Sequence, residues 1–267
     1  MNPVASTALL LALLLLSQGC GEKPASTATP AVPFDPQQQA FARVLKAVVR
    51  DGQVDYPELR RQRADLAAVL DAAAGVEREA FAAWPPDQQL PFLLNVYNAE
   101  ILALLADHPE AKSIKDLGGL RPVWNLPHVR LFGKKWSLDE LEHDLIRKQF
   151  KNPGVHFALV CGAKGCPPLR PEPYSAAELE KQFQEQARRF LGDTLKNRVD
   201  VKKRVVHLSP LFKWYREDFG KSDAELLEFV ARHLPPELAA ELGKGGFTIE
   251  YTEYDWSVNQ AAPTPQP

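Results

Sequence analysis

The stretch "HFALVCGAKGCPPL", residues 156–169, brings together residue types that often do chemistry. His156 opens an apolar run that ends at Cys161, and a loop with two glycines leads to Cys166. Two thiols at this spacing allow four kinds of site. They can form a disulfide, because so short a loop lets their Cα atoms come within about 7 Å. One can be a nucleophile activated by a histidine, both can bind a metal, or both can line a binding site as free thiols.

The predicted local structure separates these residues. The run "VHFALV" predicts a buried strand, in which successive side chains point to opposite faces. His156 then faces away from Cys161 and reaches Cys166 only if the glycine loop folds back. Cys161 is expected to be buried. Cys166, close to Lys164, is expected to have the lower thiol pKa and to be the more reactive cysteine if the two are not bonded.

Polar side chains on apolar helix faces supply further candidates. On a helical wheel, Asn98 falls inside the apolar arc of residues 88–109, Glu142 inside that of 138–150 and Asp218 inside that of 210–220. His143 flanks the second arc. A buried polar group without a partner costs on the order of 1–3 kcal/mol. We therefore expect these side chains to bind one another, the backbone or a ligand, either as a structural network or as a functional site.

The order of elements predicts an α+β fold, a single mostly helical domain with a small, largely antiparallel sheet. Capping boxes at Ser137–Glu140 and Ser175–Glu178 predict the starts of two helices, and Gly220 the end of another. Segments 123–138 and 197–209 read as hairpins, and 246–252 as a final strand. We assign the domain to residues 36–256 and a disordered tail to 257–267.

Composition narrows the function classes. The 267 residues carry a formal net charge of −2, with 25% charged and 45% apolar residues, which suits one globular core or at most two. This balance gives no electrostatic footprint for nucleic acid, and the basic run at 202–204 reads as a solvated turn. No cofactor is predicted. A small-molecule or peptide ligand fits the candidate site, and the sequence identifies no protein partner.

The N-terminus predicts a membrane anchor. "ALLLALLLLSQGC" has the length of a signal-peptide core and is too short to span a bilayer. Ser17–Cys20 resembles the lipobox of bacterial lipoproteins, although no Lys or Arg precedes the apolar run. We predict a signal peptide at 1–19, a lipid on Cys20 and a flexible tether at 20–35 rich in Pro, Ala, Ser and Thr. Gly21, in place of Asp, favours the outer membrane by resemblance to lipoprotein sorting rules. The domain would then face the periplasm, where disulfides persist.

The chain also resembles an uncharacterised family, the domain of unknown function 547. Four blocks carry the resemblance in the family's order, over about residues 87–220: "LLNVYNAEILALLADHPEAKSIKDL", "GKKWSLDELEHDLIR", "VHFALVCGAKGCPPLRPEPY" and "LSPLFKWYREDFG". The family has no assigned activity, so the resemblance implies no reaction. The family's patterns centre on Asn95, Tyr97, Asn98, Glu142, His143, His156, Cys161, Cys166, Pro167, Trp214, Tyr215 and Asp218.

Three hypotheses follow for one candidate site, and they leave open whether the protein is an enzyme. In the first, it is a thiol-dependent hydrolase or transferase acting on an acyl or peptide substrate, in which a cysteine attacks, a histidine takes the proton and a polar residue orients that histidine. In the second, it is a non-catalytic binding or scaffold module stapled by a Cys161–Cys166 disulfide. In the third, the thiols and a histidine bind a metal. The site comprises Asn98, Glu142, His143, His156, Cys161, Cys166 and Asp218.

Overall fold

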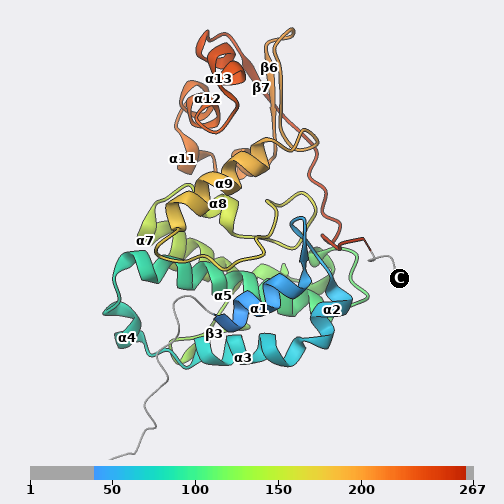
Figure 1. The fold of residues 1–267 in the computed structure, drawn as a ribbon, viewed down its shortest axis with the longest axis vertical. Helices are drawn as coiled ribbons and strands as arrows, with labels where there is room; N and C mark the ends of the chain where they lie inside the picture. The colour runs from blue at the N-terminus through green and yellow to red at the C-terminus, as the bar shows by residue number, and fades with distance from the viewer. Residues whose placement is uncertain (1–38, 263–267) are drawn as a thin grey trace, which may run out of the picture. The chain divides into compact units, whose positions relative to one another are not determined.

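A computed structural model of the protein describes residues 39–262. The predicted signal peptide, the lipid on Cys20, the tether and the predicted domain start at residue 36 lie outside the described residues. All described residues belong to one compact unit. The predicted α+β class is confirmed, because the structure combines many helices with three small sheets (Figure 1).

The N-terminal helices pack around one long central helix, α5 (Pro86–Asp107). The first helix is amphipathic, with Phe41, Val44, Leu45 and Val48 at helical spacing and all buried. Helix α5 is long and apolar enough to cross a membrane, but its most apolar stretch is 89% buried within this fold. It is therefore the core helix of the unit. The helices packed near it are α1 (Gln39–Val48), α2 (Tyr56–Arg61), α3 (Arg63–Ala74) and α4 (Arg78–Ala82).

The sheets are small and mostly antiparallel, as predicted. Two are two-stranded hairpins, β1 (Val49–Arg50) with β2 (Gln53–Val54) and β3 (Val129–Leu131) with β4 (Lys134–Trp136). In the third, β5 (Arg198–Asp200) pairs antiparallel with β6 (Val205–Leu208). The last strand, β7 (Thr248–Tyr251), pairs with β6 in parallel, with Val206 opposite Ile249.

The C-terminal half encloses a second apolar cluster, rich in phenylalanine. Phe157 lies in this cluster, while its neighbours Val155 and Ala158 belong to the cluster around α5. The short helix α8 (Val155–Ala158) thus connects the two cores (Figure 1). The other helices of this half are α9 (Leu179–Leu191), α10 (Leu211–Trp214), α11 (Arg216–Phe219), α12 (Asp223–Ala231) and α13 (Pro236–Gly243).

One continuous helix changes its winding in the middle. The predicted capping box of Ser137 and Glu140 starts α6 (Leu138–Glu140). The next seven residues, η3 (Leu141–Arg147), are π-helical, and Lys148 N–H bonds back to His143 O. The helix ends as α7 (Lys148–Phe150). π-Helical turns are rare and frequent at functional sites, and this one carries Glu142 and His143. Two 3₁₀ turns, η1 (Ile114–Leu117) and η2 (Val123–Asn125), precede it.

Two predictions of local structure were wrong. Residues 155–158 form a helical turn rather than a strand, since Asn152 Oδ1 accepts from Gly154 N–H and starts a turn there. The apolar run is buried on all sides, and burial alone does not distinguish strand from helix. Ser175 caps no helix, because its N–H donates to Gln182 and α9 begins after Glu178 without a side-chain cap.

The beginning of the predicted disordered tail is ordered. Asn259 is buried and accepts a hydrogen bond from the Tyr56 hydroxyl at 2.8 Å. Val258 pairs with Ala163, next to the cysteines. Residues 257–262 therefore belong to the fold, and they brace the loop that joins the two cysteines. Residues 263–267 lie outside the described residues.

Candidate functional site

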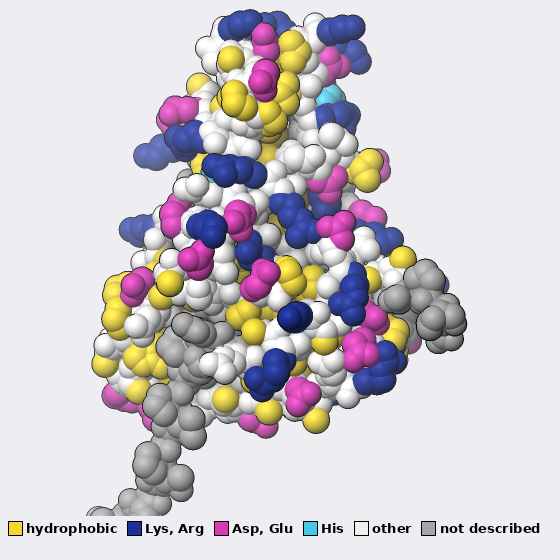
Figure 2. Space-filling view, viewed as in Figure 1, with side chains coloured by type: hydrophobic (Ala, Val, Ile, Leu, Met, Phe, Trp, Pro, Cys, Tyr) yellow, Lys and Arg dark blue, Asp and Glu magenta, His cyan; other side chains and the backbone are white. Residues whose placement is uncertain are grey.

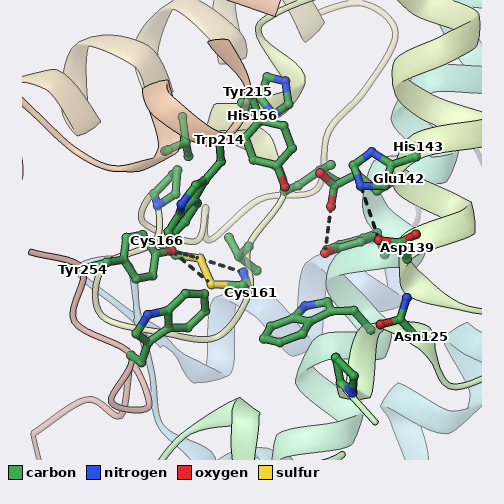
Figure 3. A pocket seen from close by; sticks show the side chains of 18 residues that line it. Asn125, Asp139, Glu142, His143, His156, Cys161, Cys166, Trp214, Tyr215 and Tyr254 are labelled. Carbon is green, nitrogen blue, oxygen red and sulfur yellow. Dashed lines mark hydrogen bonds and ion pairs between the residues drawn. A yellow bond between two sulfur atoms is a disulfide. The ribbon is translucent and has the colours of Figure 1, made fainter. Parts of the chain in front are cut away.

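A cavity of about 250 Å³ lies between η3, the cysteine loop (residues 161–166), α10 and the segment after β7 (Figure 3). We call it the aromatic cavity, because six tyrosine and tryptophan rings line it. The rings belong to Tyr97, Trp124, Trp214, Tyr215, Tyr254 and Trp256. Three of them pack together in tilted arrangements, with ring centroids 4.8 Å apart for Trp214–Tyr254 and 4.6 Å apart for Tyr254–Trp256.

The charged side chains that line the aromatic cavity are acidic. Glu142 and Asp139 contribute carboxylates, and no Lys or Arg is among the described residues that line it. The side chains of His143 and His156 also line the cavity. This lining has an acidic bias, although Lys and Arg side chains are interspersed with Asp and Glu on the face of the protein that Figure 2 shows.

Glu142 is held by two phenols. Its side chain is nearly buried, with 7% of its surface exposed. The Tyr97 hydroxyl, from α5, donates to Glu142 Oε2 at 3.2 Å, and Tyr215 also hydrogen-bonds to this carboxylate. Burial, reinforced by the charge of Glu142, raises the pKa of both tyrosines. Both phenols thus stay neutral and act as donors that fix the carboxylate at the cavity wall.

His156 is held from behind by Asp218. His156 Nε2 lies 2.5 Å from Asp218 Oδ2, and the imidazole stacks on Tyr215 with ring centroids 4.0 Å apart. Arg147 Nε donates to the same Oδ2 at 2.7 Å. The hydrogen bond from His156 and the contact with Arg147 outweigh partial burial and hold the Asp218 pKa well below its usual range. Asp218 itself does not line the cavity.

Arg147 joins the two histidines, and sequence reasoning missed it. Its Nη1 donates to His143 Nδ1 at 2.7 Å. Because arginine cannot accept a hydrogen bond, the ring proton of His143 resides on Nε2, which faces Asp139 Oδ1 at 3.4 Å. The guanidinium also lies over the Tyr215 ring, 4.9 Å from its centroid. The signal was its position four residues after His143, on the same helix face.

The two cysteines form a disulfide, with their Cα atoms 6.2 Å apart. The expected exposures are reversed: Cys161 is half-buried, whereas Cys166 is 5% exposed. The reason is that Cys161 follows a helical turn instead of ending a strand, while the loop folds Cys166 back under Tyr254. The Tyr254 hydroxyl lies 3.2 Å from Cys161 Sγ and 3.1 Å from Cys166 Sγ, and Cys161 N–H donates to Cys166 Sγ at 2.8 Å.

Asn98 supports the site without reaching it. Its Nδ2 donates to Ala158 O at 2.9 Å and its Oδ1 accepts from Val160 N–H at 3.0 Å, so it pairs the backbone that leads into Cys161. It does not line the cavity. Of the seven predicted residues, the structure thus places two outside the lining, Asn98 and Asp218. The five that line it together are Glu142, His143, His156, Cys161 and Cys166.

Sequence reasoning also missed the rings from outside the helices. Trp124 follows Pro122 in the 3₁₀ turn η2, while Tyr254 and Trp256 follow the last strand. For Tyr254 and Trp256, the only signal was the aromatic-rich stretch "YTEYDW". Lys115 Nζ lies 3.6 Å from the centroid of Trp256, so a cation already rests on one ring of the aromatic group. Within residues 39–262, no three His, Cys, Asp or Glu side chains group as a metal site requires.

Comparison with known proteins finds a resemblance to one family, and the function of that family is unknown. Residues 81–191 match the model of a family described as "Protein of unknown function, DUF547". No curated protein and no solved structure matches the chain. The matched region contains Tyr97, Glu142, His156 and both cysteines, and it ends before Tyr215 and Asp218.

Proposed function

Because the chain resembles a family whose function is unknown, we propose a function from the cavity itself: the protein is an envelope binding module for a small cationic group, such as an amine or a quaternary ammonium. The observation that carries this proposal is the nearly buried Glu142 carboxylate within a wall of aromatic rings that includes no lysine or arginine among the described residues.

The buried carboxylate calls for a countercharge. Among the described residues, the ion pairs around the cavity involve Asp139, Glu217 and Asp218, and none includes Glu142. The groups that hydrogen-bond to Glu142 are two neutral phenols. Arg147 attracts Glu142 electrostatically, but its guanidinium forms its ion pairs with Asp218 and Glu217. Burying an ionised carboxylate without a cation is costly. A ligand cation beside Glu142 would supply the missing charge.

The rings favour the same ligand. A cation within about 6 Å of an aromatic centroid gains about 0.5–2 kcal/mol from the ring's quadrupole, most on tryptophan, and aromatic cages recognise quaternary ammonium groups this way. Trp124, Trp214 and Trp256 all line this cavity. A volume of about 250 Å³ suits a small ligand or one side chain of a peptide.

The disulfide favours binding over nucleophilic catalysis. A cysteine attacks as a thiolate, and neither bonded sulfur can form one. His156 Nε2 is also engaged with Asp218 at 2.5 Å. The thiol-dependent hydrolase therefore lacks its nucleophile in this form, and we propose the stapled binding module, carried on a lipid at Cys20 on the periplasmic side of the outer membrane.

The test compares choline with 3,3-dimethylbutan-1-ol, a neutral molecule of nearly the same shape. Three of the five tryptophans line the cavity, so intrinsic fluorescence reports occupancy, with calorimetry as the second readout. We expect choline to bind at least tenfold more tightly than the alcohol. Glu142→Gln, which keeps the shape and removes the charge, should abolish that preference.

Asp144→Asn is the matched control. Asp144 lies on the same helix and is exposed, so its substitution changes the net charge equally and should leave the preference intact. Equal binding of the two ligands, or a preference that survives Glu142→Gln, would refute the proposal.

A further inference from the structure

We propose that the Cys161–Cys166 disulfide is a thiol–disulfide exchange site, in which a substrate thiolate attacks Cys161 Sγ and Cys166 leaves. This is an activity in addition to cation binding and does not require it. It assigns different roles to two sulfurs that line the same cavity (Figure 3).

The two sulfurs differ in access. Cys161 is half-buried and lines the aromatic cavity, so an incoming thiolate has a route to it. Cys166 is 95% buried, under Tyr254. Access is one of the factors that decide which sulfur is attacked, and here it favours Cys161.

The two sulfurs also differ in the hydrogen-bond donors that would stabilise each of them as a thiolate. The Tyr254 hydroxyl lies close to both sulfurs, 3.1 Å from Cys166 Sγ and 3.2 Å from Cys161 Sγ, but only Cys166 Sγ also accepts from a backbone N–H, that of Cys161 at 2.8 Å. Burial raises the pKa of Tyr254, so the phenol keeps its proton and remains a donor. A leaving thiol with a lower pKa leaves faster. These two donors would stabilise the thiolate of Cys166 as it departs.

The donors are fixed by the chain that follows the last strand. Gly165 N–H donates to Asp255 O and Lys164 N–H to Ser257 O, both at 2.8 Å. A Cβ on Gly165 would come within 2.9 Å of the Tyr254 ring, so only glycine allows this approach without a shift. The loop is therefore clamped to the residue that supplies the hydroxyl. The clamp keeps Tyr254 beside Cys166 when the S–S bond is broken.

The chemistry balances with a dithiol as the substrate. A substrate thiolate forms a bond to Cys161 Sγ, the S–S bond breaks, and its electron pair stays on Cys166 as a thiolate. The second substrate thiol, deprotonated, then attacks the substrate sulfur of the mixed disulfide and releases Cys161 as a thiolate. The substrate loses two electrons and two protons and becomes a disulfide, while the protein gains a dithiol. A second disulfide compound restores the protein by the reverse exchange.

The first test replaces Tyr254 with phenylalanine, which keeps the ring and removes the donor. The native protein is reduced by dithiothreitol without denaturant, and free thiols are counted over time. We expect reduction to proceed in the folded state and Tyr254→Phe to slow it about tenfold, as the loss of one hydrogen bond to a charged group implies. Tyr251→Phe is the matched control, since Tyr251 is an exposed tyrosine just upstream, and it should reduce at the native rate.

The second test measures thiolates by their absorbance near 240 nm as a function of pH. In Cys161→Ala, which keeps the backbone donor, Cys166 should titrate below the ordinary thiol pKa of about 8.5. Its pKa should rise when Tyr254→Phe is added. In Cys166→Ala, Cys161 should titrate above Cys166. A disulfide that opens only on unfolding, a Tyr254→Phe variant that is reduced as fast as the native protein, or the reverse order of the two thiol pKa values would overturn the proposal.

Discussion

Replacing Asn98 with alanine tests whether the cavity depends on a residue that does not line it. The Asn98 side chain is 2% exposed and binds both the Ala158 carbonyl and the Val160 amide. These are the backbone groups at the end of α8, where the chain leaves the helix and turns toward Cys161. Neither group is hydrogen-bonded to another backbone group of a helix or sheet. The Asn98 side chain therefore supplies the partner for both.

The expected cost follows from the groups left unpaired. A stranded buried backbone group costs about 1–3 kcal/mol, and a cavity adds to this. Asn98→Ala leaves two such groups unpaired. If the surrounding backbone relaxes in part, we expect the free energy of unfolding to fall by about 2–4 kcal/mol. For a domain of this size, that lowers the melting temperature by about 5–15 °C. Asn98→Asp should cost at least as much, because a carboxylate cannot donate to Ala158 O and would be buried.

Urea unfolding followed by circular dichroism measures this loss, and Asn125→Ala is the control. The Asn125 side chain is exposed, so the same substitution there should change stability by less than about 0.5 kcal/mol. A loss below 1 kcal/mol for Asn98→Ala would show that water or a shifted backbone satisfies the two groups. The positioning role assigned to Asn98 would then be wrong.

Three further predictions concern other parts of the chain. Glu142→Leu should cost about 1–3 kcal/mol in urea unfolding, because it strands the hydroxyls of Tyr97 and Tyr215, whereas the isosteric Glu142→Gln should cost less than about 1 kcal/mol. The lowered pKa of Asp218 means that its contribution to stability is complete above the unfolded carboxyl pKa of about 3.9 and is lost as the pH falls toward the folded value; unfolding midpoints measured from pH 2 to 7 should therefore fall less steeply below pH 4 in Asp218→Asn. Cys20→Ala should move the protein from the membrane fraction to the soluble periplasm, and intact mass showing an unmodified Cys20 in the native protein would contradict the predicted anchor.

Local patterns were enough to predict which polar residues face inward. The helical wheels singled out Asn98 and Glu142 because an amide or a carboxylate in an apolar arc is visible within one helix, and both are buried. The same method placed Asp218 inward. It is only partly buried, with 27% of its side chain exposed. A helical wheel cannot tell whether such a side chain faces a cavity or binds the backbone. Glu142 lines the cavity, whereas Asn98 binds backbone groups.

Tertiary contacts decided what the sequence left open. The spacing of Cys161 and Cys166 allowed a disulfide, free thiols or a metal, and nothing near them in the chain distinguished these states. The residue that contacts both sulfurs, Tyr254, lies 88 positions beyond Cys166. The predicted strand at 155–160 was wrong for a similar reason. Its apolar residues lie on every side because the segment lies between two cores, so the sequence shows neither the alternation of a strand nor the spacing of a helix.

Tyr215 connects His156, on one part of the cavity wall, with Glu142 on another. Its hydroxyl bonds to Glu142, its ring stacks on His156, and Arg147 lies over that ring. One side chain therefore connects the carboxylate that we propose to bind a cation with the His156–Asp218–Arg147 network behind it. Because His156 and Arg147 both contact the Tyr215 ring, they also fix the direction from which the phenol donates to Glu142. The network thus positions the binding carboxylate through Tyr215, which gives the buried His156 and its paired Asp218 a role that does not depend on the state of the cysteines.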